Sequence, residues 1–395
     1  MPKKRESHTL VRSFVLVLLI VSFALPSEPA ITGNSMVVQA STPAKTTGPT
    51  ASFKWSMPKR FGPKNAQGLV DYHWDQKAKT YEPAYVNPAS WTVNFDACVP
   101  SAVPDSSFEW QIDGQVRPNP NPKACTFTHR FTAQKTCPVK LTVTAPDGQT
   151  SSDEMNITVK DLLLVSIGDS VASGEGNPDK PRKTRPAQWI DRLCHRSATA
   201  GPAQAAMRIE NSDPHTSVTF VSFACSGAGI EEGLLGAYKG LPPQLTQLVN
   251  AVSGRPIDAL LISIGLNDAY FSKLVTKMIQ LKHCDQHSPT KALLEKGLQQ
   301  LPGRYAKLAK RINDAHLVTK VLITEYPDVL RDKSKSFCDN SPAIPDLLYG
   351  INAAEAKWAF ESIIIPINDA VRTAAGLWGW VYVGDIALKI WGWAT

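Results

Sequence analysis

The sequence predicts two folded units, an all-β sandwich followed by a larger α/β unit built on a parallel sheet. Two patterns carry this prediction. Short alternating segments with frequent turns precede residue 160, and continuous apolar runs separated by longer helical segments follow it. The chain has 395 residues, 43% of them hydrophobic and 19% charged, so it is long enough to give each unit its own core.

The amino terminus has the features of an export signal. Basic residues at the start are followed by an apolar run from Ser13 to Leu25, which is too short to span a bilayer comfortably. We expect residues 1–40 to be a signal peptide cut after Ala40 or nearer Ala30, so that the mature chain is secreted or extracytoplasmic. The alternative is an uncleaved membrane anchor.

The charge balance argues against a nucleic-acid partner. The formal net charge is +7 and the isoelectric point is near 8.9, and part of this excess lies in the basic start of the signal segment. No basic stripe interleaved with aromatic residues follows. We therefore expect no nucleic-acid binding.

The cysteines indicate disulfides. No CxxC spacing gathers them into a metal site, and we expect neither a metal nor an organic cofactor. An odd count leaves one sulfur without an intramolecular partner. The seven cysteines are Cys98, Cys125, Cys137, Cys194, Cys225, Cys284 and Cys338.

Two segments precede the α/β unit. Residues 41–88 are rich in Pro, Ser, Thr and Lys with little periodicity, which indicates an extended linker. Residues 89–160 show period-two patterning broken by turn signals such as Asp113-Gly114, which predicts a β-sandwich. The expected strands are Trp91–Phe95, Phe108–Ile112, Cys125–Phe131, Val139–Thr144 and Glu154–Val159.

Part of this segment resembles a known domain type. The runs Phe127–Phe131 and Cys137–Thr144, with the following Asp147-Gly148 turn, resemble the final strands of a polycystic-kidney-disease (PKD) or related immunoglobulin-like domain. Such domains usually carry an aromatic residue where Cys137 stands, which indicates a local disulfide from Cys137 to Cys98 or Cys125. The resemblance implies spacing, or contact with a cell surface or polysaccharide; the alternative is a stabilising cap for the next domain.

From residue 161 onwards, continuous apolar strands alternate with helical segments, which predicts a parallel sheet buried on both faces. In such a sheet, ligands bind at the carboxyl ends of the strands. The expected strands are Leu162–Ile167, Val218–Phe223, Ala259–Ile264, Val321–Thr324 and Trp380–Val383.

Three of these strand ends carry groups suited to attack on a carbonyl. The first ends in Gly168-Asp169-Ser170, the second in Ala224-Cys225-Ser226-Gly227, and the third in Gly265-Leu266-Asn267-Asp268. An ester carbonyl oxygen becomes an oxyanion when a serine attacks it, and preorganised donors stabilise that charge. The backbone N–H groups of Ser170 and Gly227 and the side-chain amide of Asn267 are such donors. On its own, an Asp-Ser pair after a strand is usually an ordinary helix cap.

Together, the three blocks resemble those of the GDSL/SGNH hydrolase family of esterases and lipases, over a stretch from about Leu162 to the end. The resemblance implies a three-layer, flavodoxin-like domain over residues 161–395 that hydrolyses carboxylic esters of lipids or acetylated carbohydrates through an acyl-serine intermediate. It assigns Ser170 as nucleophile and Gly227 and Asn267 as oxyanion donors. The secreted bacterial branch of the family further implies a disulfide between Cys194 and Cys225.

The family signature also includes a histidine base near the carboxyl end, and no histidine follows His316 in this sequence. Trp393 stands near its expected position. The sequence leaves two accounts: a truncated chain, or a protein that has lost hydrolysis and keeps the pocket as a surface or carbohydrate-binding module. His195 lies between the first two blocks, where we expect a structural role for it.

Overall fold

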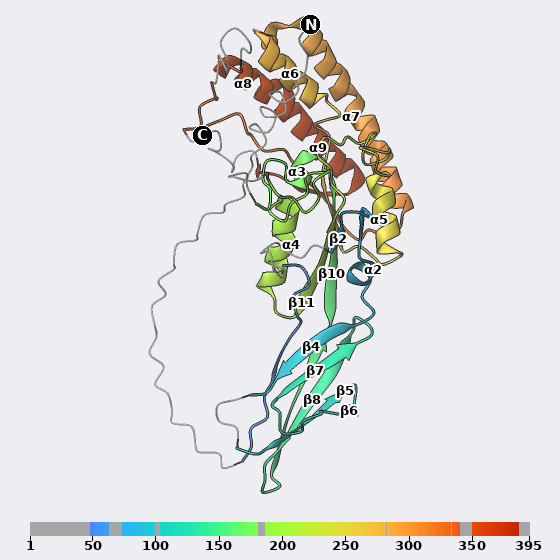
Figure 1. The fold of residues 1–395 in the computed structure, drawn as a ribbon, viewed down its shortest axis with the longest axis vertical. Helices are drawn as coiled ribbons and strands as arrows, with labels where there is room; N and C mark the ends of the chain where they lie inside the picture. Colours follow the sequence, from blue (N-terminus) through green and yellow to red (C-terminus); the bar gives the residue numbers. More distant parts are fainter. Residues whose placement is uncertain are drawn as a thin grey trace.

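The computed structural model describes two units that lie end to end (Figure 1). The described residues are 48–62, 73–98, 103–180, 186–281, 283–332, 334–339 and 350–386. The expected signal peptide, residues 1–40, lies outside these ranges, as does Trp393. Among the described residues, no helix combines the length and the apolar character that crossing a membrane requires.

The amino-terminal unit consists of two antiparallel sheets. One contains β1 (Lys54–Ser56), β4 (Trp91–Asp96) and β7 (Thr126–Phe131) in that order. The other has the order β6 (Gln115–Arg117), β5 (Ser107–Ile112), β8 (Thr136–Thr144) and β9 (Thr150–Thr158). The alternating residues of β4, β5 and β8 point into one shared apolar core, with Trp110 fully buried in it. The five strands expected here are confirmed.

The cysteine pairing in this unit differs from the expectation. Cys98 is bonded to Cys125, and Cys137 is a buried free thiol. Cys137 faces the apolar core from β8, where burial raises the pKa of its thiol and it packs as a small hydrophobic side chain. The predicted disulfide involving Cys137 was therefore wrong.

The segment expected to be an extended linker contributes ordered elements. Besides β1, it forms the small hairpin of β2 (Trp74–Asp75) and β3 (Thr80–Tyr81), followed by α2 (Pro83–Val86). The hydroxyl of Tyr81 accepts a hydrogen bond from the Ser222 N–H (2.8 Å) and donates to the Ser222 carbonyl (3.0 Å). Tyr85 does the same for Phe220. These hydroxyls satisfy backbone groups of β11 at the edge of the main sheet, where unpaired groups would otherwise remain.

The carboxy-terminal unit is built on a five-stranded parallel sheet with the order β11-β10-β12-β13-β14. Its strands are β10 (Lys160–Gly168), β11 (Thr216–Ser222), β12 (Ala259–Ser263), β13 (Val321–Thr324) and β14 (Val381–Val383). This is the 2-1-3-4-5 order of flavodoxin-like folds, and it confirms the predicted α/β class.

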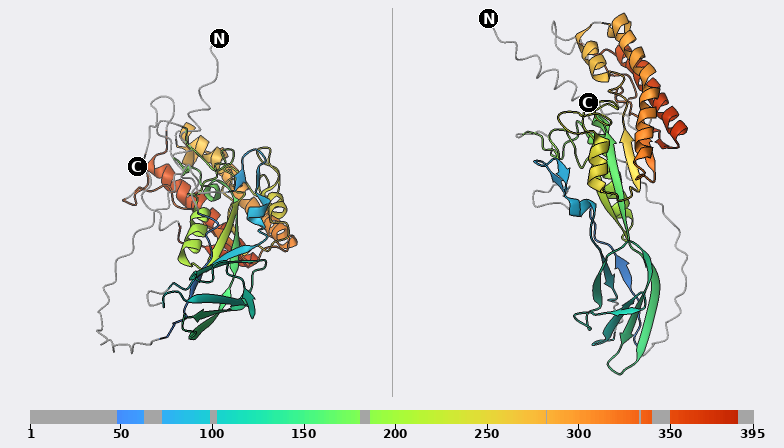
Figure 2. Two further views of the ribbon diagram at one scale, coloured as in Figure 1. Left: turned by 60° about the horizontal axis from the view of Figure 1, so that its bottom comes forward. Right: turned by 90° about the vertical axis from the view of Figure 1, so that its right-hand side faces the viewer.

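Helices cover both faces of this sheet. Right-handed crossovers place α3 (Ser170–Ser173) and α4 (Gly201–Ser212) on one face, and α5 (Gln244–Val252), α7 (Ser288–Asp314) and α9 (Ile365–Trp378) on the other. The helices α6 (Phe271–Gln280) and α8 (Ala353–Ala359) pack further out, beyond the end of the sheet (Figure 2). A 3₁₀ turn, Cys284–Gln286, precedes α7, and a π-turn, Phe360–Ile364, joins α8 to α9.

A buried carboxylate fastens the two units together. Asp161 is the second residue of β10 and is 1% exposed. Its side chain receives an indole hydrogen bond from the sandwich at 3.2 Å and an arginine hydrogen bond from the α/β unit at 3.1 Å. Because a buried charge is tolerated only when it is paired and hydrogen-bonded, this cluster ties the sandwich to the start of the central strand. The partners of Asp161 are Trp91, Ser217, Thr219, Arg255 and Arg60.

Candidate active site

Ser170 is the first residue of α3, immediately after the central strand β10. The chain leaves the strand through Gly168, which has φ +142°. A Cβ at this position would collide with the Ser263 carbonyl oxygen and with Ala172, so no other residue fits here. Ser170 is 7% exposed, and among the described residues no hydrogen bond engages its hydroxyl.

Asp169 orders this turn from within the protein. Its carboxylate accepts a hydrogen bond from the Val171 N–H (3.0 Å) and another from the Tyr326 hydroxyl. Burial raises the pKa of Asp169 to about 7, although these two hydrogen bonds work in the opposite direction. The side chain therefore acts as a helix cap, as expected, rather than facing a substrate.

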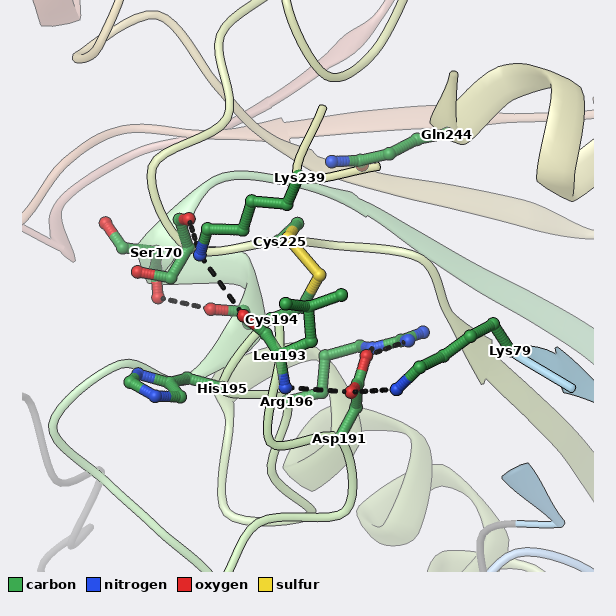
Figure 3. The surroundings of a disulfide bond; sticks show 12 residues. Lys79, Ser170, Asp191, Leu193, Cys194, His195, Arg196, Cys225, Lys239 and Gln244 are labelled. Atoms are coloured by element: carbon green, nitrogen blue, oxygen red, sulfur yellow. Dashed lines mark hydrogen bonds and ion pairs between the residues drawn. A yellow bond between two sulfur atoms is a disulfide. The ribbon is translucent and has the colours of Figure 1, made fainter. Parts of the chain in front are cut away.

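The second turn, which carries Gly227, is joined directly to the first. The Cys225 N–H donates to the Gly168 carbonyl (3.0 Å), and Cys225 is bonded to Cys194, which confirms this disulfide. Figure 3 shows Ser170, the disulfide and Lys239 together; the Lys239 ammonium donates to the carbonyls of Ser226 (2.9 Å) and Leu193 (3.2 Å). The loop before Gly227 is thus held by one covalent bond and several hydrogen bonds.

Gly227 has φ +88°, and a Cβ on it would collide with the Tyr238 hydroxyl. A side chain at this position is excluded both by backbone strain and by space. This turn therefore requires glycine.

The third turn, which carries Asn267, is bonded to the second. The Asn267 side-chain amide donates to the Ala228 carbonyl at 2.8 Å. The neighbouring Asp268 accepts from the Ile230 N–H (2.9 Å) and from Arg304 (3.0 Å), while its burial raises its pKa to about 6. An amide nitrogen carries two protons, so Asn267 keeps one for another acceptor.

Tyr326 bridges the first and third turns, and sequence reasoning missed it. Its hydroxyl donates to Asp169 and accepts from the Leu266 N–H (3.1 Å). The ring follows β13 and is fully buried, and Asn368 of α9 binds both the N–H and the carbonyl of Tyr326. The one signal in the sequence was its position just after the fourth strand.

His195, which follows the disulfide-bonded Cys194, is held by a carboxylate. Nδ1 of His195 lies 2.7 Å from Glu175, and the imidazole stacks on Trp189 with ring centroids 4.6 Å apart. Burial raises the pKa of Glu175, but hydrogen bonds from His195 and Ser226 outweigh it and hold the pKa below its ordinary value. Glu175 was not singled out from the sequence. Among the described residues, no His, Cys, Asp and Glu side chains gather into a metal site.

Hydrogen bonds thus link the three turns that carry Ser170, Gly227 and Asn267. A family model for the GDSL-like lipases and acylhydrolases matches residues 164–370, more than half of the chain. The chain belongs to the GDSL-like lipase/acylhydrolase family. The three turns described above all lie within the matched residues, and the family hydrolyses carboxylic esters.

Solved structures to which part of this chain is similar include two enzymes from Streptomyces. An extracellular lipase from Streptomyces rimosus is 22% identical, with 56% of this chain and 79% of that chain covered and a TM-score of 0.39. A phospholipase A1 from Streptomyces albidoflavus is 22% identical, with 57% of this chain and 80% of that chain covered and a TM-score of 0.37. A carbohydrate acetylesterase from Xanthomonas citri is 14% identical, with 77% of this chain and 66% of that chain covered and a TM-score of 0.26. No curated protein sequence matches this chain.

Proposed function

We propose that this protein is an exported serine esterase in which Ser170 attacks the carbonyl carbon of a carboxylic ester. The Ser170 oxygen forms a bond to that carbon, the carbonyl becomes an oxyanion, and the alcohol leaves with a proton as the acyl-serine forms. Water then attacks the acyl-serine, which releases the carboxylic acid and restores the hydroxyl. Lipids and acetylated carbohydrates are the candidate substrates.

The observation that carries this proposal is the hydrogen-bonded connection of the three turns. Cys225 bonds to Gly168, Asn267 bonds to Ala228, and Tyr326 bonds to both Asp169 and Leu266. Donors fixed in this way need no reorganisation as negative charge develops, and each one is typically worth about 3 kcal/mol of transition-state stabilisation. The Gly227 N–H, the second Asn267 proton and the Ser170 N–H fill this role in the proposal.

The decisive test is hydrolysis of p-nitrophenyl butyrate by the secreted chain. We expect Ser170→Ala to abolish turnover and Asn267→Ala to lower kcat by about 100-fold, while KM changes little. Ser212→Ala is the control, because Ser212 is exposed at the far end of α4. A folded protein that shows no Ser170-dependent turnover would instead be a binding module, and the proposal would be wrong.

The proton of Ser170 has to pass to a base. His195, for which the sequence favours a structural role, is the histidine we test for this second role. Its loop is bonded to the second turn, because the Ser226 N–H donates to the Cys194 carbonyl (3.0 Å), and Glu175 orients its ring. His195→Asn separates two roles. Loss of rate at unchanged stability identifies the base, and loss of stability at an unchanged rate identifies a structural residue.

Export and surface contact complete the proposal. Two disulfides, Cys98–Cys125 and Cys194–Cys225, fit an oxidising compartment outside the cytoplasm. We assign the amino-terminal sandwich a PKD-like role in contacting a cell surface or polysaccharide. A co-sedimentation assay of the full secreted chain with insoluble cell-wall polysaccharide tests this role: the chain should pellet with the polysaccharide, and a chain that stays in the supernatant would refute it.

A further inference from the structure

The hydroxyl of Tyr238 lies at the turn that carries Gly227. An ideal Cβ on Gly227 would stand 2.4 Å from this oxygen, so the hydroxyl fills the space of the missing side chain. Among the described residues, no hydrogen bond engages the Tyr238 hydroxyl, and its oxygen is not completely enclosed. Phenylalanine would fill the same ring site without leaving a polar group unpaired, so packing alone does not require this oxygen.

A tight turn fixes the backbone of Tyr238. Its N–H donates to the Leu241 carbonyl (3.1 Å), and its carbonyl accepts from the Leu241 N–H (2.9 Å). The two residues between them, Lys239 and Gly240, have φ of +50° and +76°, as a type I′ turn requires. The Lys239 ammonium also donates to the Ser226 carbonyl, which fastens this tight turn to the second strand-end turn.

The ring of Tyr238 is held by the same part of the chain. It packs against a small buried cluster that includes the Cys194–Cys225 disulfide and Ala228. Ala228 is also the residue whose carbonyl accepts from the Asn267 amide. Backbone and ring are thus both fixed next to the proposed oxyanion donors, so the hydroxyl needs little reorganisation to act with them.

The Gly227 N–H is close enough to share an acceptor with this hydroxyl. The N–H has no acceptor of its own among the residues that the structure describes. The nitrogen and Cβ of one residue lie about 2.5 Å apart, so the hydroxyl oxygen is at most about 5 Å from the Gly227 nitrogen. Hydrogen bonds of about 2.9 Å to the nitrogen and about 2.7 Å to the hydroxyl together exceed this separation. One ligand oxygen can therefore lie within hydrogen-bond distance of both groups.

We propose that the Tyr238 hydroxyl is a further oxyanion donor of this site, acting beside the Gly227 N–H. This inference rests on the proposed function, in which the ester carbonyl gains negative charge when Ser170 attacks. Burial raises the pKa of Tyr238, so the hydroxyl keeps its proton at neutral pH and can donate it in a hydrogen bond. Tyrosine is among the side chains that stabilise a developing oxyanion in this way.

The variant Tyr238→Phe tests this role, because it removes the oxygen and keeps the ring. We expect kcat for p-nitrophenyl butyrate to fall by about 100-fold with little change in KM, because the donor acts once the oxyanion forms. The midpoint of urea unfolding should stay the same, because the hydroxyl has no partner among the described residues.

Tyr85→Phe is the matched control, because it removes a hydroxyl that holds the backbone of Phe220. It should lower the midpoint of urea unfolding and leave kcat unchanged. A loss of kcat in Tyr238→Phe that comes with a lower unfolding midpoint would show that Tyr238 is structural, and it would overturn the proposal.

A binding measurement separates this inference from the proposed function. Butaneboronic acid forms a tetrahedral, negatively charged adduct on a serine hydroxyl, so its affinity reports on the oxyanion donors without turnover. In calorimetric titration of the full secreted chain, Tyr238→Phe should weaken binding by about tenfold, and Tyr85→Phe should leave it unchanged.

The outcomes are distinct. If Tyr238→Phe matches the unmodified chain in kcat and in boronate affinity while hydrolysis depends on Ser170, this inference is wrong and the proposed function stands. If the unmodified chain neither binds the boronic acid nor shows Ser170-dependent hydrolysis, both are wrong.

Discussion

The substitution Tyr326→Phe removes a single hydroxyl and tests the hydrogen-bonded link between the first and third turns. The substitution leaves the Leu266 N–H without its acceptor and the Asp169 carboxylate without one of its donors. An unsatisfied buried donor costs about 1–3 kcal/mol, and a hydrogen bond to a charged group contributes about 1.5–3 kcal/mol. We expect a loss of about 3 kcal/mol in the free energy of unfolding at pH 8, and a fall in kcat because Asn267 is no longer held in place.

The loss in the free energy of unfolding caused by Tyr326→Phe should depend on pH, and the pKa of Asp169 determines whether the loss grows or shrinks as pH rises. The folded-state pKa of Asp169, about 7, lies above its unfolded value of about 3.9, so the contribution of this group to stability is complete below pH 4 and is lost as pH rises towards 7. The Tyr326 hydrogen bond lowers this pKa, so its removal raises the pKa further and extends the loss of stability above pH 7. The difference between wild type and variant therefore grows from pH 6 to pH 8.

Urea unfolding followed by tryptophan fluorescence at pH 6, 7 and 8 measures this difference. Tyr305→Phe is the matched control: the Tyr305 hydroxyl is equally buried but donates to a backbone carbonyl, that of Ile264 (2.6 Å). It should cost about 1 kcal/mol with no dependence on pH. A pH-independent loss in Tyr326→Phe, or equal profiles for the two variants, would refute the reasoning.

Three further changes test other contacts. Gly168→Ala should prevent accumulation of folded, secreted protein, because its Cβ collides with the Ser263 carbonyl. Gly303→Ala, at a glycine of α7 with open space, is the control and should fold, as checked by circular dichroism. The double substitution Cys194→Ser and Cys225→Ser removes a disulfide between residues 31 positions apart and should lower the free energy of unfolding by about 2–4 kcal/mol. A thermal melt should therefore show a lower melting temperature, and an unchanged one would show that the bond is not formed. Asp161→Asn should cost about 3 kcal/mol in urea unfolding because two arginines lose their buried partner. Asp314→Asn, which breaks an exposed ion pair, should leave the free energy of unfolding nearly unchanged.

The parallel sheet was readily predicted from the sequence because its strands are continuous apolar runs. The expected strand Leu162–Ile167 lies within β10, and Val321–Thr324 coincides with β13. Strands buried on both faces leave this pattern in the sequence itself, without reference to partners. The three strand-end blocks were visible for the same reason, since each follows a recognisable run.

The elements between residues 41 and 88 were not predictable in this way. Their order depends on partners far along the chain: Tyr81 and Tyr85 bind the backbone of β11, more than 130 residues away in sequence. Short polar and proline-rich segments show no periodicity, so pattern reasoning identifies them as linkers. Tyr326 and Glu175 were missed for a related reason, because their roles follow from distant hydrogen-bond partners rather than from any local motif.

The same limit explains the error at Cys137. Sequence alone places three cysteines in one small β-unit, but pairing depends on how strands face one another across it. Cys137 points into the apolar core between the two sheets, whereas Cys98 and Cys125 lie at the ends of neighbouring strands of one sheet.

The most direct test is a crystal structure of the secreted chain after reaction with diethyl p-nitrophenyl phosphate, an ester that leaves a phosphoryl group on an activated serine. We predict a single adduct on Ser170, with one phosphoryl oxygen about 3 Å from both the Gly227 nitrogen and the Asn267 amide nitrogen. An adduct on another residue, or a phosphoryl oxygen that points to solvent with neither donor in reach, would contradict the account.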